Sequence, residues 1–204
     1  MHGAQSNGTL RDGESDGAVE DFLMQTAGDG RAFRDALGCF PTGVAVITAH
    51  IADRHPMGIT VNSFTSVSLE PPLILWCVDR RSQRFETFAN AGYFTVSILD
   101  ATHEAVSCRL ARPGEHRLDG IPLAATKFGA PALADALAVF ECRREAMYDG
   151  GDHAVLLGRV MHFTRRHSGA PLIFFRGRYL SPPADDSRAT PDAKVREFLA
   201  SDCE

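Results

Sequence analysis

Long apolar runs are missing from this sequence, which excludes a protein with a membrane-spanning helix. No stretch reaches the roughly 18 to 20 uninterrupted apolar residues of a membrane-spanning helix, and the first residues contain no apolar signal core. Clustered positive charge is missing too, because the basic residues are dispersed and the net charge is −5. We therefore expect a cytoplasmic protein that binds neither a membrane nor nucleic acid.

Paired cysteines and the common catalytic motifs are also missing. The five cysteines are widely spaced and odd in number, with no CxxC pair, which disfavours a zinc site or a disulfide framework. The sequence contains no GxSxG, GxxxxGK[ST] or HExxH motif, and its histidines are not spaced to share one helix face. No metal site is expected.

Apolar residues are present in sufficient number for one hydrophobic core, at 204 residues and 44% hydrophobic content. Gly, Ser, Asp and Asn are frequent over residues 1–28, which predicts a disordered leader. A helix is expected next, because Asp29 is a candidate N-cap and apolar side chains follow at helical spacing until Pro41. One domain is expected over residues 29–180, and a C-terminal extension with a short helix over residues 181–204.

Extended segments outnumber helical ones in the rest of the chain. Alternating or apolar segments rich in Val, Ile, Leu and Phe predict strands. Two segments predict helices capped by Ser82 and Thr102, and the Pro- and Gly-rich residues 112–132 predict a surface loop. Regular βαβ alternation is absent, so we expect a mainly β protein, a closed or nearly closed antiparallel barrel with peripheral helices. The expected strands are 44–49, 57–61, 73–78, 93–99, 137–147, 153–164 and 171–175.

The most informative segment is GITVNSFTSVSLEPP at residues 58–72. It places six small hydrogen-bonding side chains within nine positions, between two apolar strands. If they face one shared pocket, such groups suit a planar ligand with many acceptors, such as a flavin. A Ser/Thr-rich edge strand or turn, whose hydroxyls satisfy local backbone groups, is the alternative. The six residues are Thr60, Asn62, Ser63, Thr65, Ser66 and Ser68.

Three other places carry candidate ligand contacts. Arg81 and Ser82 follow an apolar strand where a helix is expected to begin, which suits a phosphate, although a capped helix start with solvated arginines fits equally. Asp152 and His153 follow two glycines at a strand mouth, but a lone histidine is more often a surface or core residue. Residues 174–179 mix aromatic rings with guanidinium groups, as either a ligand contact or a solvated edge strand does.

Five motifs follow one another in the chain: FPTGV at residues 40–44, GITVNSFTSVS at 58–68, PPL at 71–73, GDH at 151–153 and FRGRY at 175–179. In this order they resemble the short-chain flavin reductases, the reductase components of two-component flavin-dependent monooxygenases. The resemblance covers about residues 30–180. It implies an FMN-binding split barrel that is usually a homodimer. It also implies that hydride passes from a reduced nicotinamide to FAD or FMN, and that the reduced flavin is supplied to a partner monooxygenase. The sequence has no obvious arginine cluster for a 2′-phosphate, which favours NADH over NADPH.

The resemblance also implies site residues. The polar run would hold the isoalloxazine and ribityl groups, Arg81 and Ser82 would lie toward the phosphate, and His153 would act near the nicotinamide as the catalytic residue. Because the cofactors carry the hydride chemistry, the lack of a catalytic triad does not count against an enzyme. A flavin- or haem-binding split-barrel module without turnover, or a non-catalytic subunit of a monooxygenase, remains an alternative. The expected cofactor contacts are Thr42, Thr60, Val61, Asn62, Ser63, Ser66, Val67, Ser68, Arg81, Ser82, Phe88, His153, Arg176 and Tyr179.

Overall fold

The computed structural model describes residues 28–49 and 55–182. The leader expected over residues 1–28 and the C-terminal extension expected over residues 181–204 lie almost entirely outside these ranges. None of the helices that the structure describes is long and apolar enough to cross a bilayer.

The helix expected after the leader is α1 (Gly30–Leu37). Its N-cap is confirmed, because the Asp29 carboxylate accepts the backbone N–H groups of Arg31 at 2.9 Å and Ala32 at 3.1 Å. The helix ends at Leu37, earlier than the sequence predicts. Contacts within the chain divide it after Leu37, so α1 is described by itself.

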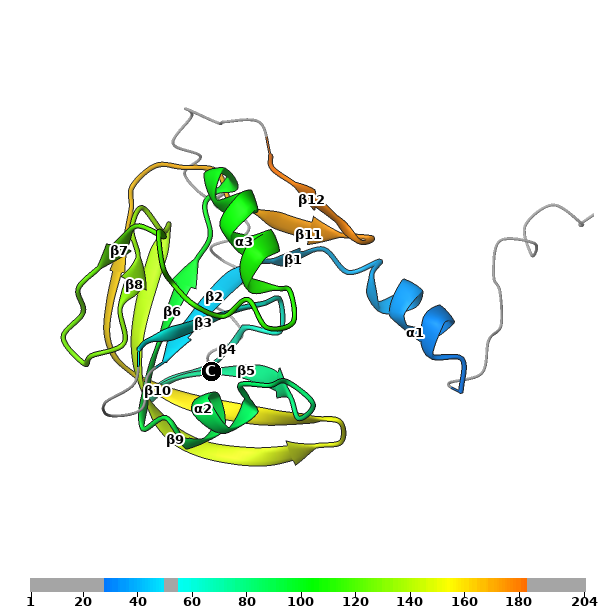
Figure 1. Cartoon of the computed structure of the whole chain (residues 1–204), viewed down its shortest axis with the longest axis horizontal. Coiled ribbons are helices and arrows are strands. Elements are labelled where there is room, and N and C mark those ends of the chain that lie inside the picture. The colour runs from blue at the N-terminus through cyan, green and yellow to red at the C-terminus, as the bar shows by residue number, and fades with distance from the viewer. Residues whose placement is uncertain (1–27, 50–54, 183–204) are drawn as a thin grey trace, which may run out of the picture. The chain divides into compact units, whose positions relative to one another are not determined.

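A seven-stranded sheet in the order β3-β2-β6-β9-β10-β5-β4 forms the barrel, and every neighbouring pair is antiparallel. β3 and β4 are the two ends of this order, although they follow each other in the chain. The mainly β split barrel with peripheral helices is confirmed, as Figure 1 shows. The strands are β2 (Ala45–Ala49), β3 (Met57–Val61), β4 (Thr65–Leu69), β5 (Pro72–Asp79), β6 (Tyr93–Ile98), β9 (Ala138–Gly150) and β10 (His153–Arg165).

Smaller elements surround this barrel. β1 (Thr42–Gly43), β11 (Ile173–Phe175) and β12 (Arg178–Leu180) form a second, three-stranded sheet. The expected surface loop at residues 112–132 also contributes two short paired strands, β7 (Leu123–Ala124) and β8 (Ala132–Leu133). The helices are α2 (Phe85–Asn90), the 3₁₀ turn η1 (Ala101–His103) and α3 (Glu104–Leu110).

Both predicted helix caps are wrong. α2 begins at Phe85, and the Ser82 hydroxyl accepts the Arg84 N–H at 3.3 Å in a turn before the helix. At the other helix, Asp100 caps η1, because its carboxylate accepts the N–H of Thr102 at 3.0 Å and the hydroxyl of Thr102 at 2.9 Å. A carboxylate is the stronger acceptor, so Thr102 becomes a donor to the cap.

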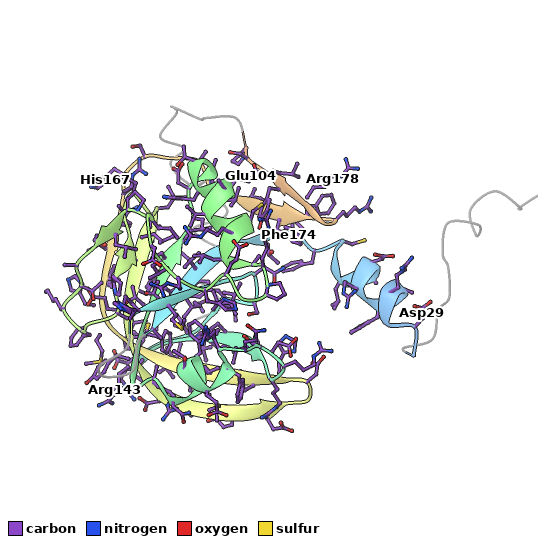
Figure 2. All side chains as sticks on the ribbon, viewed as in Figure 1. Asp29, Glu104, Arg143, His167, Phe174 and Arg178 are labelled. Atoms are coloured by element: carbon purple, nitrogen blue, oxygen red, sulfur yellow. The ribbon has the colours of Figure 1, made fainter. Side chains whose placement is uncertain are left out.

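The core lies on both faces of β2, as its alternation predicts. Ile47 and its like-facing neighbours point into the barrel, whereas Val46 packs in a second cluster with Leu110 of α3. Trp76 is fully buried at the barrel centre, and Phe88 of α2 meets it edge-on at 5.8 Å. Burial of side chains of this size stabilises the fold by about 2 to 3 kcal/mol each. Side chains fill the space between the ribbons in Figure 2.

Four buried polar side chains of the barrel hold the loop at residues 126–133. Thr48 and Thr95 donate to carbonyl groups of the loop, and Ser97 accepts the Leu133 N–H at 3.1 Å. The Glu141 carboxylate accepts two further loop N–H groups, at 2.7 and 3.1 Å. The fold therefore satisfies these buried polar groups internally.

Candidate functional site

The polar run of residues 60–68 lies where the barrel is split. β3 pairs only with β2 and β4 only with β5 among the described strands, and residues 62–64 connect one edge strand to the other. At the start of β3 the outer edge is covered, because the Gly58 N–H donates to the His116 carbonyl at 2.8 Å. Farther along, backbone groups at the split can bind a ligand or another chain.

Two hydroxyls of the run form hydrogen bonds to other elements, and a third, that of Thr65, donates to the neighbouring Ser66 carbonyl at 3.4 Å. The Thr60 hydroxyl donates to the Ser107 carbonyl of α3 at 2.9 Å. The Ser63 hydroxyl accepts the Cys77 N–H at 2.9 Å and donates to the Cys77 carbonyl at 3.3 Å. These two bonds satisfy backbone groups of β5 past the point where β4 stops pairing with it. For these two side chains the alternative, that the hydroxyls satisfy backbone groups, is correct.

Three other side chains of the run have no such partner. Asn62, Ser66 and Ser68 make no side-chain hydrogen bond to any residue that the structure describes. The expectation that the whole run faces inward to one pocket is wrong, because Thr65, Ser66 and Val67 are exposed on β4. The second half of the run forms the edge strand β4, which agrees with the alternative of a Ser/Thr-rich edge strand. The free groups therefore lie along the open edge of the barrel.

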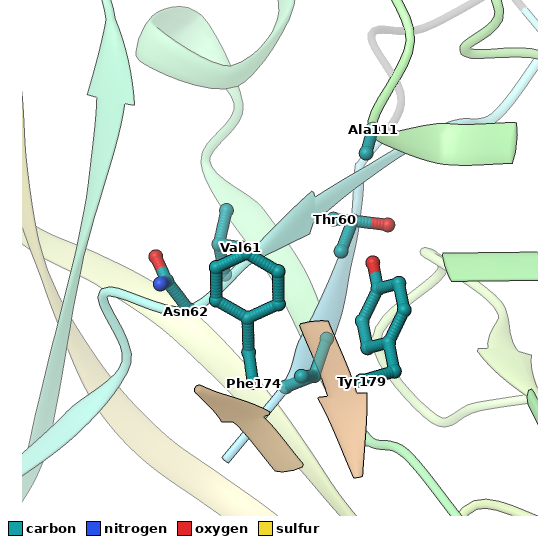
Figure 3. Close-up of a pocket in the computed structure, with 7 residues that line it drawn as sticks. Thr60, Val61, Asn62, Ala111, Phe174 and Tyr179 are labelled. Atoms are coloured by element: carbon teal, nitrogen blue, oxygen red, sulfur yellow. The ribbon is translucent and has the colours of Figure 1, made fainter. Parts of the chain in front are cut away.

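A pocket of about 220 Å³ lies beside the end of β3, under the β11–β12 hairpin. The rings of Phe174 and Tyr179 stand beside Thr60 and Val61 in Figure 3, and they meet edge to face with centroids 5.5 Å apart. Whole ligands occupy about 300 to 1,000 Å³, so this volume suits one part of a larger ligand. The pocket is lined by Val44, Thr60, Val61, Asn62, Ala111, Phe174 and Tyr179.

Tyr179 is fixed at this pocket by a buried partner. Its hydroxyl lies 2.8 Å from the Ser107 hydroxyl, and Ser107 is fully buried on α3. Burial raises the pKa of Tyr179, so the phenol stays neutral and can donate a hydrogen bond. Thr42 pairs with Phe174 across β1 and β11, and its hydroxyl is buried without a hydrogen-bond partner among the described residues.

Arg176 lies at the tip of the β11–β12 hairpin. It and Gly177 both have positive φ, at 47° and 75°, as a tight two-residue turn requires. Its guanidinium lies 5.2 Å from the centroid of the Phe175 ring, and it donates to the Cys39 sulfur at 3.7 Å. This predicted cofactor contact is thus held by neighbours of its own at an exposed turn.

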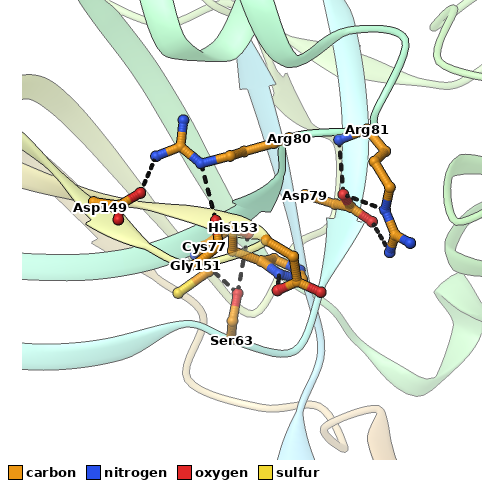
Figure 4. Close-up of polar contacts among 9 residues, drawn as sticks. Ser63, Cys77, Asp79, Arg80, Arg81, Asp149, Gly151 and His153 are labelled. Atoms are coloured by element: carbon orange, nitrogen blue, oxygen red, sulfur yellow. Dashed lines mark hydrogen bonds and ion pairs between the residues drawn. The ribbon is translucent and has the colours of Figure 1, made fainter. Parts of the chain in front are cut away.

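A second group of polar residues, drawn in Figure 4, lies at the strand mouth, where β5 ends at Asp79 and β10 begins at His153. His153 faces Asp79 across β10 and β5, and its Nδ1 lies 2.7 Å from the Asp152 carboxylate. The hydrogen bond from His153 lowers the pKa of Asp152, and that from Arg81 lowers the pKa of Asp79. Arg81 is therefore paired with Asp79, at 3.0 Å, where the sequence predicts a phosphate contact.

The structure thus separates the predicted cofactor contacts into groups. Phe88 is only 1% exposed in the barrel core and offers no surface to a ligand, because α2 is amphipathic and buries this ring against Trp76. Sequence reasoning missed Val44 and Ala111 as pocket walls, since an apolar side chain gives no polar signal, whereas Phe174 belongs to the candidate segment 174–179. Among the described residues, no three His, Cys, Asp or Glu side chains are grouped to hold a metal ion. Thr60, Val61, Asn62 and Tyr179 line the pocket; Ser66, Val67 and Ser68 lie on β4; Arg81, Ser82 and His153 lie toward the strand mouth.

Comparison with known proteins gives a consistent assignment. A family model described as flavin reductase like domain matches residues 37–182. A probable flavin reductase of Rhizobium meliloti is 43% identical over 155 residues, which cover 76% of this chain and 49% of that relative, so the chain spans about half its length. The FMN reductase (NADH) SmoA of Agrobacterium fabrum is 42% identical over 149 residues, covering 73% of this chain and 84% of that protein.

A solved structure supports the same assignment. The Streptomyces globisporus NADH:FAD oxidoreductase SgcE6, in complex with NAD and FAD fragments, has 34% sequence identity and a TM-score of 0.76, and the match covers 81% of this chain and 99% of that one. The family expected from the sequence is therefore confirmed, and this chain belongs to the flavin reductase-like domain family.

Proposed function

We propose that this chain is an NAD(P)H:flavin oxidoreductase that reduces FAD or FMN and supplies the reduced flavin to a partner monooxygenase. The observation that carries the proposal is the set of polar side chains at the split without a hydrogen-bond partner among the described residues: Asn62, which lines the aromatic-walled pocket, and Ser66 and Ser68 on the edge strand β4. Relatives support it by name: an FMN reductase (NADH), an NADH-dependent FAD reductase and a reductase subunit of a flavin-dependent monooxygenase.

The residues at the split fit a flavin. A flavin ring has an apolar end and a pyrimidine end with donors and acceptors. Val44, Val61 and Phe174 give the pocket an apolar wall, and the Asn62 amide can both donate and accept. Because the pocket holds only part of such a ligand, the polar remainder would contact the hydroxyls of Ser66 and Ser68 on the exposed edge of β4.

The chain's own residues supply binding and orientation. A flavin and a reduced nicotinamide bound at the split would supply the hydride chemistry themselves. His153 would contact the nicotinamide, because its Nδ1 is held by Asp152 and its other ring nitrogen is free for a ligand. Arg80 and Arg81 are each ion-paired, with Asp149 and Asp79, so neither guanidinium is available to a 2′-phosphate, which favours NADH over NADPH.

We also propose a homodimer. Val67 and Leu69 are 47% and 85% exposed on the edge strand β4, and Phe163 of β10 is 64% exposed. An open edge strand with exposed apolar side chains is normally covered by another chain. Analytical ultracentrifugation should give a dimer that Leu69→Lys weakens. A monomeric wild-type protein would contradict this part of the proposal.

The decisive test is anaerobic mixing of the purified full chain with NADH and either FAD or FMN. We expect the flavin absorbance to bleach, with a faster rate for NADH than for NADPH. If neither flavin is reduced, the proposed activity is wrong. A yellow protein that keeps its flavin and never oxidises NADH would instead identify a non-catalytic flavin-binding module.

A further inference from the structure

We propose that Arg80 is a positioning residue for His153. Arg80 holds the β9–β10 turn against the end of β5, so that Asp152 keeps the His153 imidazole in one orientation. The inference rests on the proposed function, because it concerns how the same site receives the nicotinamide.

Arg80 contacts the turn in three places, as Figure 4 shows in part. Its backbone N–H donates to the Asp152 carbonyl at 2.9 Å. Its Nε donates to the Gly151 carbonyl at 3.2 Å, and its Nη2 forms an ion pair with Asp149 at 2.5 Å. The same guanidinium lies 5.7 Å from the centroid of the Phe85 ring at the start of α2. One side chain thus connects β5, the turn and α2.

The turn depends on such a contact for its order. β9 and β10 form a long hairpin, and residues 149–152 at its tip are all exposed. Gly151 has φ of 75°, and glycine has the largest backbone freedom of any residue. Exposed hairpin tips with few buried contacts are the first parts of a fold to open. A guanidinium fork can bind a carbonyl and a carboxylate at once, which a lysine ammonium does less well.

The order of the turn reaches the imidazole through Asp152. Its carboxylate lies 2.7 Å from His153 Nδ1, and a carboxylate at that distance keeps the proton on Nδ1 and leaves the other ring nitrogen as an acceptor. The other nearby carboxylate, Asp79, is already bound by Arg81 through two side-chain contacts, at 3.2 and 3.0 Å. Asp152 is therefore the residue that sets the tautomer of His153. The Arg80 side chain acts on Asp152 through the turn, at the Gly151 carbonyl and Asp149, whereas its backbone bond to the Asp152 carbonyl does not depend on the side chain.

The first experiment needs neither flavin nor nicotinamide. In ¹⁵N-histidine NMR spectra of the full chain, wild-type His153 should show a protonated Nδ1. Arg80→Ala and Asp152→Asn should both shift the signal toward a mixture of the two tautomers. The matched control is Arg117→Ala, which removes another exposed, ion-paired arginine, 2.5 Å from Asp119, and should leave the signal unchanged.

The second experiment separates positioning from general damage. Arg80→Ala should raise the KM for NADH about fivefold, the size expected when one ordered side chain becomes mobile, and leave the flavin KM within about twofold. Asp152→Asn should give the same change, the double variant no more, and Arg80→Lys an intermediate value. An unchanged His153 signal in Arg80→Ala, or equal rises in both KM values, would overturn the inference. If wild-type protein oxidises no NADH, the proposed function fails, and the NMR result still decides the role of Arg80.

Discussion

Polar side chains enter the barrel wall in two regions, and the fold uses them differently. In the first region, Thr48, Thr95, Ser97 and Glu141 are buried, and each is hydrogen-bonded to the loop at residues 126–133. In the second region, at the split, the hydroxyls of Thr60 and Ser63 form hydrogen bonds to other elements, and that of Thr65 bonds the neighbouring Ser66 carbonyl. The side chains of Asn62, Ser66 and Ser68 have no partner among the described residues.

The difference has an energetic reason. A buried polar group without a partner costs about 1 to 3 kcal/mol, so the fold must satisfy the first region internally. An exposed group such as the Asn62 amide is bonded by water instead and costs little. The first region therefore stabilises the chain, whereas the second region is free to bind something else. Each prediction below tests one side of this division.

The largest effect is expected for Glu141→Ala. Glu141 is 4% exposed, and its carboxylate accepts two backbone N–H groups of the loop and lies 3.0 Å from His162 Nδ1. Removing this buried carboxylate leaves three part-buried donors without their partner, so the free energy of unfolding should fall by about 3 kcal/mol. Urea unfolding measures this. A loss no greater than that of a neutral surface substitution would remove the stabilising role of the first region.

The second effect concerns binding. Asn62→Ala should raise the flavin KM about tenfold, which corresponds to about 1.4 kcal/mol of binding energy, because no internal contact replaces the lost amide. The free energy of unfolding should stay within about 0.5 kcal/mol of wild type. The control is Asn90→Ala, which removes an exposed amide bound to Glu86 on α2 and should leave the flavin KM unchanged. If the variant loses stability but not flavin binding, Asn62 has the stabilising role of the first region.

The sequence predicts the strands of both regions well. The alternation of residues 44–49 fixes two buried faces on β2, and the expected strand 57–61 coincides with β3. Composition fails to predict which polar residues are free, because Ser63 and Ser66 are chemically alike and differ only in what β5 offers to each. Composition does not predict the burial of Phe88 for the same reason, because this burial depends on Trp76, a residue on another element.

A smaller loss of stability should follow Thr95→Val. The side chains have the same shape, so the change removes only the hydroxyl that donates to the Ala130 carbonyl at 2.6 Å. That carbonyl also accepts the Thr126 hydroxyl at 2.8 Å and so keeps one partner. The free energy of unfolding should fall by about 1 kcal/mol, measured with urea, while the flavin KM stays unchanged. A change in flavin KM would mean that the loop and the split are coupled.

The smallest effect is expected for Glu145→Gln. It is measured as the pH dependence of the difference in stability between wild type and variant. Glu145 lies on β9 like Glu141, but it is bound by Arg159 at the surface, at 2.8 and 2.9 Å. The hydrogen bond from Arg159 lowers the pKa of Glu145 from 4.5 to about 2, so the carboxylate stays ionised in the folded state after the unfolded chain has bound its proton.

The stability from this pair is therefore fully present above pH 4.5 and is lost as the pH falls toward about 2. Urea midpoints of wild type and Glu145→Gln should differ near neutral pH and converge in acid. Added salt should shrink the difference, because exposed ion pairs are screened. A difference that is constant over this pH range would show that the ion pair contributes nothing, and that stability in this wall comes from buried groups such as Glu141 alone.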